Sequence, residues 1–362
     1  MILFSKKFLC VIFLVSCGKG GGDNPIKDTA EGSDEPVITG LTYKNPVFQP
    51  ILADPSVIKA GDTFYAYGTQ DDWGDGKGSR LVPVIKSKDL ITWSVVGNAF
   101  ATRPSWKTSG GIWAPDINYF NSKYYLYYAL STWGDTNPGI GVALSDKPEG
   151  PFQDQGKLFD TQSIGVPNSI DPTIFEDDGV RYLIWGSFST ASTQGIHGVQ
   201  LVSDGLSIIP SSKFKIAAGD FEAPMIYKRR GYYYFFGSKG GCCDGAGSTY
   251  HVMVARSGSL KGPYLDKAGN DIAQNGNGTI LIDGGNSFVG PGHNAHIVTD
   301  DKGTDWFLYH AISIANPKLA NGTTLRALML DKLTWENDWP VIKDKKPSST
   351  LQSAPNFNNT TP

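Results

Sequence analysis

Three acidic residues open short apolar runs that are typical of β-strands. Asp54 and Asp171 each precede a proline, and Glu222 opens the sequence Glu-Ala-Pro. A protonated carboxylic acid beside an ionised carboxylate is the pair that hydrolysis of a glycosidic bond needs, because one protonates the leaving oxygen and the other activates water. Asp and Pro also mark strand boundaries without doing any chemistry. For these three acids together, we favour the catalytic interpretation.

The acids belong to a unit that recurs along the chain. Each copy has an apolar run, a polar turn and a second run rich in Tyr, Phe or Trp. The five copies span residues 54–68, 114–128, 169–187, 222–237 and 293–309. A period of roughly 50–70 residues is typical of a radial array of small sheets. The sequence therefore predicts an all-β protein, a five-bladed β-propeller.

A third apolar run follows each strand pair, and no stretch shows sustained helical periodicity. The third runs span residues 81–87, 140–145, 195–201, 250–257 and 325–331. Polar turns and Gly-Pro-aromatic sequences come next in two copies, at 150–152 and 262–264. We expect these sequences to close the four-stranded sheets.

Propeller geometry predicts that the acids converge. The innermost strand of each blade lines the central channel, so the polar residues that open these strands should face one axis. They are Asp54, Asp116, Asp171, Glu222 and His293. Like charges this close raise the pKa of one member, which would keep one acid protonated. For Asp116 alone, we favour a structural role at a strand boundary.

Inserted loops follow the second strand of four copies. They span residues 71–79, 131–138, 189–195 and 238–247. Because strand directions alternate, the four loops should lie on one face of the propeller and form the walls of a cleft. Trp113 is interpreted either as a platform for a sugar ring or as part of a blade core.

Length and composition limit the classes of function. The chain has 362 residues with 40% hydrophobic and 12% aromatic residues, enough for one large all-β domain. The net charge of −3 at pH 7 gives no electrostatic argument for nucleic acid. We expect a monomer that binds no nucleic acid.

The first residues resemble an export signal. Two lysines precede the apolar run 8–15, and small residues lead to Cys17, as in a bacterial lipobox. We interpret residues 1–16 as a lipoprotein signal peptide, with an ordinary secretory signal as the alternative. Lipid on Cys17 would anchor the protein in the bacterial cell envelope, at the outer membrane surface or on the periplasmic face.

The remaining segments complete the expected domain organisation. Residues 17–40 are rich in Gly, Asp, Glu and Ser and are expected to form a flexible tether. Residues 41–345 would form the propeller, and 346–362 a C-terminal tail that is coil or one short strand. Cys242 and Cys243 remain in the domain, and we expect them to shape a cleft wall without bridging each other, because the ring so formed is strained.

An ordered set of short motifs resembles glycoside hydrolase family 43. The set comprises Asp54-Pro55, WAPDI (113–117), NSIDPTIF (168–175), WGSF (185–188), FEAP (221–224) and GPGHN (290–294), and the resemblance covers roughly residues 45–342. The resemblance implies a five-bladed propeller fold and hydrolysis with inversion of the anomeric configuration. By position, it implies that Asp54 is the general base, that Glu222 is the general acid, and that Asp171 tunes the pKa of the acid and orients the substrate.

Further motifs are most similar to endo-α-1,5-L-arabinanases of that family. These are KGGCCDG (239–245), GPGHN and RALMLDKLTWENDWPVI (326–342). They imply arabinan or arabino-oligosaccharide as substrate and a calcium ion held near His293 on the axis. The substrate contacts implied are Gly134, Asn168, Ser169, Ile170, Ser187, Phe188 and Ser189.

Two departures leave alternatives open. The residue before the base, commonly His in arabinanases, is Ala53, and Ser189 replaces an aromatic residue. An exo-acting α-L-arabinofuranosidase or β-xylosidase therefore stays an alternative, as does a non-catalytic surface propeller that binds sugar. His293 is either a metal ligand or a core histidine, and because calcium prefers oxygen we expect mostly water around the ion. Arg326 either pairs with a carboxylate or anchors the last blade.

Overall fold

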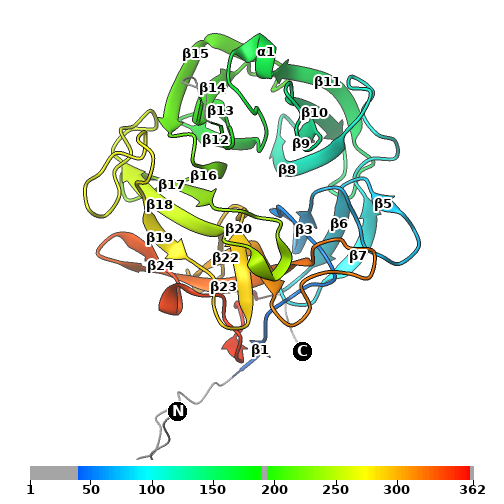
Figure 1. Cartoon of the computed structure of the whole chain (residues 1–362), viewed down its shortest axis with the longest axis vertical. Coiled ribbons are helices and arrows are strands. Elements are labelled where there is room, and N and C mark those ends of the chain that lie inside the picture. The colour runs from blue at the N-terminus through cyan, green and yellow to red at the C-terminus, as the bar shows by residue number, and fades with distance from the viewer. Residues whose placement is uncertain (1–39, 190–193, 359–362) are drawn as a thin grey trace, which may run out of the picture. The chain divides into compact units, whose positions relative to one another are not determined.

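Five β-sheets surround one central axis in the computed structural model (Figure 1). The structure describes residues 40–189 and 194–358. The predicted signal peptide, Cys17 and almost all of the predicted tether lie outside these residues. The sequence-based prediction of an all-β, five-bladed propeller is confirmed.

Each blade is one antiparallel sheet whose strands follow one another in chain order from the axis outward. Blade 1 contains β2 (Ser56–Ala60), β3 (Thr63–Tyr67), β6 (Pro83–Ser87) and β7 (Ser94–Asn98). Blade 2 contains β8 (Gly111–Phe120), β9 (Lys123–Ser131), β10 (Gly139–Ser145) and β11 (Gln153–Asp160). Blade 3 contains β12 (Thr173–Asp177), β13 (Val180–Trp185), β14 (Ile196–Leu201) and β15 (Ile208–Ala217).

The last two blades complete the ring. Blade 4 contains β16 (Glu222–Arg229), β17 (Tyr232–Lys239), β18 (His251–Ser257) and β19 (Thr279–Ile282). Blade 5 contains β20 (Phe288–Gly292), β22 (Asp305–Ser313), β23 (Arg326–Glu336) and β24 (Trp339–Val341), and β21 (Val298–Thr299) also pairs with β22. Short elements lie between or beside the blades: the pair β4 (Asp71–Asp72) and β5 (Ser79–Arg80), α1 (Thr161–Ile164), η1 (Gly245–Gly247) and η2 (Lys343–Lys345).

Neighbouring blades pack face to face, which explains why the second strands read as continuous apolar runs. In β9 all residues from Tyr125 to Ser131 are buried, since both faces of the strand are covered. Aromatic rings fill the layer between blades 1 and 2, where Tyr67 meets Phe152 edge-on with ring centroids 6.1 Å apart. Most of the aromatic residues are therefore core residues.

The fourth strands lie further along the chain than the sequence predicted. The Gly-Pro-aromatic sequences at 150–152 and 262–264 are irregular segments that follow turns, and the strands β11 and β19 come after them. In blade 1, bends over residues 88–92 separate the third strand from the fourth, β7. The outer strands are exposed on one face, so their apolar pattern is weaker than that of the inner strands.

Each blade turns sharply at the top of its inner edge through a residue with positive φ. These residues are Asp54, Ala114, Asp171, Ala223 and His293, with φ between 45° and 57°. The left-handed region is uncommon for residues with a side chain, and its recurrence marks one equivalent position in the five blades. The sequence had aligned Asp116 and Glu222 with this position. Instead, Glu222 lies one residue before it and Asp116 two residues beyond it.

Asp116 consequently lies deeper in the channel and joins several blades. Its carboxylate accepts hydrogen bonds from the amide nitrogen of Ile174 (2.8 Å) and from Nδ2 of Asn118 (2.8 Å). Nε2 of His296 lies 3.1 Å from Oδ1 of Asp116, and Oγ of Ser56 donates to the same oxygen at 3.4 Å. Asp116 is buried, and its structural interpretation agrees with these contacts.

Replacing Asp116 with Ala is expected to lower the free energy of unfolding by about 3–5 kcal/mol, because several buried donors lose their acceptor. Denaturant unfolding of the variant measures this effect. The control is Asp146→Ala, which removes an exposed pair with Lys123 and should cost less than about 1 kcal/mol. Equal losses in the two variants would show that Asp116 does not join the blades.

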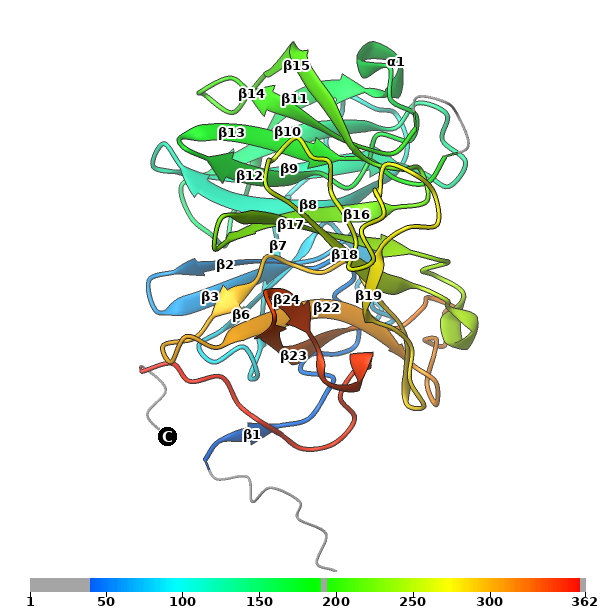
Figure 2. The ribbon, with the colours of Figure 1, turned by 90° about the vertical axis from the view of Figure 1, so that its left-hand side faces the viewer.

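The residues before blade 1 close the ring against blade 5. The amide nitrogens of Val47 and Leu52 donate to the carbonyl oxygens of Leu328 and Arg326, at 2.9 and 3.0 Å. β1 (Thr42–Tyr43) pairs with β25 (Gln352–Ser353), and Figures 1 and 2 show the two ends of the domain side by side. The segment predicted as a tail therefore contains the short final strand and packs on the propeller.

Among the described residues, the structure has no helix long and apolar enough to cross a membrane.

Candidate active site

A cavity of about 550 Å³ opens at the top of the channel, and all five blades contribute to its lining. The loops that follow the second strands of blades 1 to 4 supply its walls, at Asp71, residues 131–135, residues 187–188 and residues 242–243. The sequence had predicted a cleft walled by these loops. Asp54, Asp171 and Glu222 all line the cavity, and so does Arg326 of blade 5.

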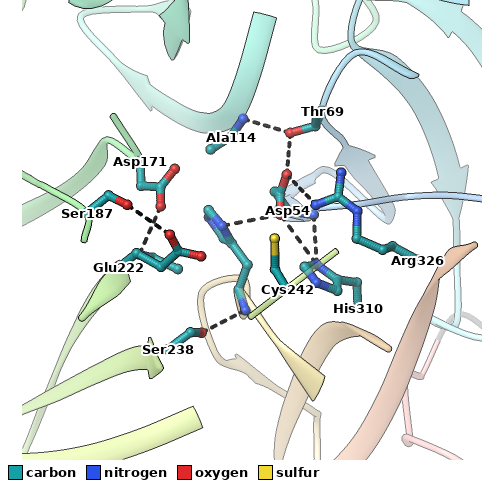
Figure 3. A network of polar contacts seen from close by, with 12 residues as sticks. Asp54, Thr69, Ala114, Asp171, Ser187, Glu222, Ser238, Cys242, His310 and Arg326 are labelled. Carbon is teal, nitrogen blue, oxygen red and sulfur yellow. Dashed lines mark hydrogen bonds and ion pairs between the residues drawn. The ribbon is translucent and has the colours of Figure 1, made fainter. Parts of the chain in front are cut away.

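Asp54 lies in a polar cage (Figure 3). Oγ1 of Thr69 donates to Oδ2 of Asp54 at 2.5 Å. Nη1 of Arg326 donates to both carboxylate oxygens, at 3.1 and 3.2 Å. Nδ1 of His293 and Nδ1 of His310 each lie 3.4 Å from Oδ1. The cage fixes the position of the carboxylate, which accepts hydrogen bonds from Thr69 and Arg326.

The charge state of Asp54 follows from this cage. Burial alone would raise the pKa of Asp54, but the charge of Arg326, with smaller contributions from His293, His310 and Thr69, lowers this pKa well below its ordinary value. Burial lowers the pKa of His310 to about 3, so this ring is neutral. Its Nδ1 accepts the backbone N–H of Asp54 at 3.1 Å. Asp54 is therefore ionised wherever the protein is folded near neutral pH.

Glu222 has the opposite environment. Burial raises the pKa of Glu222 to about 7, although hydrogen bonds from Tyr250 and Ser187 lower it. Oγ of Ser187 donates to Oε2 of Glu222 at 2.8 Å. A carboxyl group with this pKa holds its proton through part of the neutral range, which suits a general acid.

Asp171 adjoins Glu222. Oδ2 of Asp171 accepts the backbone N–H of Ala223, the residue that follows Glu222, at 3.0 Å. Burial and the charges of Glu222 and Asp54 raise the pKa of Asp171 well above its ordinary value. We therefore expect Asp171 and Glu222 to share one proton near neutral pH, because two like charges at this depth are unfavourable together.

A second set of polar groups lies at the ends of the second strands; the sequence analysis predicted only Ser187 of this set, and as a substrate contact. Thr69, Ser187 and Ser238 each follow a glycine there, and His310 holds the corresponding place in blade 5. Oγ of Ser238 accepts the backbone N–H of His293 at 3.0 Å. These groups hold the residues that open the inner strands. The recurrence of Gly followed by Ser or Thr was a usable signal.

Most of the predicted substrate contacts reach the cavity. The lining includes Trp113, Gly134, Asn168, Ile170, Ser187 and Phe188. The ring of Trp113 lies 5.7 Å from that of Trp133, whose side chain is 79% exposed. Two partly exposed indole rings at the rim favour the platform interpretation of Trp113 over the core interpretation.

Two predicted substrate contacts are not part of the lining. Ser169 is fully buried, and its hydroxyl donates to the carbonyl of Val166 at 2.8 Å and accepts from Nε1 of Trp185 at 3.0 Å. Ser169 thus supports the loop and does not face the cavity. The backbone N–H of Ser189 donates to the carbonyl of Gly219 at 3.1 Å, at the edge of the described residues.

The expectation that Cys242 and Cys243 stay unbridged is wrong. The structure joins them by a disulfide, and both residues line the cavity. Their predicted place in the cleft wall is confirmed. The strain argument that excluded the bridge ignored the backbone around it, where glycines at 240, 241 and 245 remove side chains that would crowd the loop.

The environment of His293 limits how a metal ion could bind. In residues 40–189 and 194–358 no group of three or more His, Cys, Asp and Glu side chains is arranged to hold a metal. His293 offers one imidazole, whose Nδ1 faces Asp54. This donor set fits only an ion bound through one nitrogen and otherwise through water, as the sequence predicted. A calcium ion here stays a prediction.

The arrangement as a whole suits acid–base hydrolysis. One carboxylate is ionised and fixed, another carboxyl group has a raised pKa, and a third adjoins the second. All three carboxyl groups line one cavity that has aromatic rings at its rim. This is the combination that cleavage of a glycosidic bond requires.

The comparisons with known proteins agree with this geometry. The family model for glycosyl hydrolases family 43 matches residues 43–340. The extracellular endo-α-(1→5)-L-arabinanase 1 of Bacillus subtilis is 35% identical over 305 residues, which are 80% of this chain and 87% of that protein.

Two further relatives differ in their named activity. The extracellular exo-α-(1→5)-L-arabinofuranosidase ArbA of Cellvibrio japonicus is 32% identical, over 82% of this chain and 88% of that protein. The solved structure of the α-L-arabinanase of Cellvibrio cellulosa in complex with arabinohexaose superposes with a TM-score of 0.70 at 31% identity, and covers 82% of this chain and 97% of that one.

Proposed function

Because the chain belongs to glycosyl hydrolases family 43, we propose that it cleaves α-1,5-linked L-arabinan with inversion at the anomeric carbon, and that it acts within the polymer. The observation that carries the proposal is the pair formed by ionised Asp54 and by Glu222, whose pKa burial raises to about 7, in one cavity. The named activities of the relatives support arabinan as the substrate.

In the proposed mechanism, Asp54 accepts a proton from a water molecule that attacks the anomeric carbon. Glu222 donates its proton to the glycosidic oxygen as the leaving group departs on the opposite side. The space for the water requires carboxyl groups about 6.5–9.5 Å apart, against about 5–5.5 Å in retaining enzymes. Arg326 and Thr69 hold Asp54 in position, and Ser187 holds Glu222.

Exo action is the second candidate, favoured by the exo-acting relative of Cellvibrio japonicus. Product sizes from linear arabinan distinguish the two modes. An endo-acting enzyme releases oligosaccharides of mixed length early, whereas an exo-acting enzyme releases one product throughout. Branched arabinan and xylan are the comparison substrates. Failure to cleave any arabinan, with cleavage of xylan, would overturn the substrate assignment.

Asp171 is expected to set the pH dependence. Activity requires protonated Glu222, so it should fall as pH rises through about 7, the raised pKa of Glu222. When Glu222 holds the proton that the pair shares, Asp171 is negative. Asp171→Asn removes this charge, so the pKa of Glu222 should fall and the alkaline limb should move down by about one unit or more.

The pH dependence of kcat/KM measures this shift, and Asp178→Asn, an exposed acid of the same blade, is the control. A variant at Asp171 that lost activity equally at every pH would contradict the pKa role and leave only a positioning role.

Removal of calcium should lower the melting temperature if His293 holds an ion on the axis. Dialysis against a chelator, followed by calorimetry and an activity assay, measures the effect, and added calcium should reverse it. His293→Ala should abolish the calcium response, whereas His251→Ala, outside the cavity, should keep it. An unchanged melting temperature after complete chelation would refute the proposal.

We infer that the protein is exported, from its N-terminal residues and from the relatives named as extracellular. The lipid anchor at Cys17 stays a prediction, since Cys17 lies outside the described residues.

A further inference from the structure

One wall of the cavity is a disulfide between consecutive residues. Cys242 and Cys243 are both partly exposed, and both line the cavity together with Glu222 of the same blade. In Figure 3 the sulfur of Cys242 points towards the space between Asp54 and Glu222. The acid and the disulfide are thus neighbours on the wall that blade 4 contributes.

The loop that carries the disulfide is fixed by its own hydrogen bonds. The carbonyl of Gly241 accepts from Oγ of Ser248 at 2.7 Å and from the backbone N–H of Thr249 at 3.1 Å. Gly240 has φ +85°, and a Cβ there would lie 2.3 Å from the carbonyl oxygen of Thr249. The tight turn therefore requires glycine, and the hydrogen bonds of Gly241 hold the loop in this conformation.

A neighbouring blade fixes the disulfide as well. Oγ1 of Thr324, in the segment before β23, donates to the carbonyl of Cys243 at 3.0 Å. Arg326, two residues later, holds Asp54. The same segment of blade 5 thus positions both the disulfide and the base, so the distance between the apolar wall and the reacting groups is set by the fold.

A sugar ring presents hydroxyl groups at its edge and C–H groups on its face, so a binding site needs an apolar surface beside its polar groups. On the opposite wall, Trp113 and Trp133 supply such a surface. Blade 3 contributes Ile170 and Phe188 beside Asp171 and Ser187. The lining residues of blade 4 are Glu222 and the two cysteines, so among the described residues the cysteines supply the apolar atoms of that wall. A disulfide is polarisable and, unlike two thiols, donates no hydrogen bond.

We propose that the Cys242–Cys243 disulfide is a platform for the substrate and contacts the C–H face of the arabinofuranosyl unit bound beside Glu222. The inference rests on the proposed function and names a specificity determinant of that site. Reduction separates the sulfurs, frees their side chains to rotate and introduces two polar S–H groups. The reduced enzyme therefore binds the sugar less tightly.

The first test replaces both cysteines, Cys242→Ser with Cys243→Ser, and measures kcat and KM on linear arabino-oligosaccharides. The value of kcat/KM should fall about 10-fold or more, mainly through KM, in line with the effect of altering one apolar contact in a pocket. The melting temperature should change little, because a bridge between adjacent residues closes a minimal loop. Ala246→Ser, an exposed change in the same loop outside the cavity, is the control and should behave as wild type.

The second test keeps the native sequence and reduces the disulfide with a phosphine, which is oxidised as the two thiols form; mass spectrometry confirms the gain of two hydrogens. The wild type should lose the same fraction of kcat/KM and recover it on reoxidation, whereas the double variant should not respond. Unchanged kcat/KM after confirmed reduction overturns the platform. An oxidised wild type that cleaves no arabinan overturns the proposed function instead, so the two failures are distinguishable.

Discussion

Asp54→Asn is expected to lower kcat on arabinan by about 10²–10⁴-fold, the usual contribution of a general base. The amide is nearly isosteric, so Thr69 keeps a partner, but the amide cannot take a proton from water. Arg326 loses its ionised partner and keeps Asp71, whose Oδ2 lies 3.7 Å from its Nη2. We therefore expect the variant to fold, with a small decrease in melting temperature.

Calorimetry of the variant separates loss of chemistry from loss of fold. Asp62→Asn, an exposed acid in the turn of the same blade, is the matched control and should be fully active. NMR of a fresh wild-type reaction tests the stereochemistry at the same time, because a base acting on water gives the inverted anomer as first product. A retained anomer, or a fully active Asp54→Asn, would refute the assignment of the base.

The inner part of the fold was predictable because the same local constraints, burial and a sharp turn, recur in every blade. The second strands are buried on both faces, and the chain must turn sharply at the upper ends of the innermost strands, where Asp54 and Asp171 stand before a proline. Those constraints are local, so they leave a readable pattern. The outer strands β7, β11 and β19 have one exposed face, and their positions depend on loops whose lengths vary between blades.

The parts of the site that sequence reasoning missed depend on contacts between blades. The structural role of Asp116 was predicted but its place was not, because a shift of two residues along the strand moves its carboxylate deeper in the channel, where it contacts other blades. His310 meets Asp54 across 256 residues of sequence. The disulfide depends on a glycine-rich loop whose geometry no spacing rule encodes.

Glu222→Gln is expected to abolish cleavage of arabinan while sparing substrates that need no acid. The leaving group in arabinan is a sugar hydroxyl, which departs poorly without a proton, so the loss in kcat should again be about 10²–10⁴-fold. In an aryl arabinofuranoside the leaving group is an acidic phenol, which departs without protonation. The rate of cleavage of this substrate should therefore fall much less. Ser187 can donate to the amide oxygen of the variant as it does to Oε2 of Glu222.

The comparison of the two substrates is what makes Glu222→Gln decisive. A residue that only binds the sugar would lower the rates on both substrates alike, whereas a general acid is needed in proportion to the basicity of the leaving group. The alkaline limb that burial of Glu222 places near pH 7 should also disappear from the aryl substrate profile of the variant. Glu176 is an exposed acid paired with Arg181, and Glu176→Gln is the control. It should change neither the ratio of the rates on the two substrates nor the alkaline limb of the pH profile. Equal losses on arabinan and on the aryl substrate would remove Glu222 from the role of acid and leave it as a binding residue.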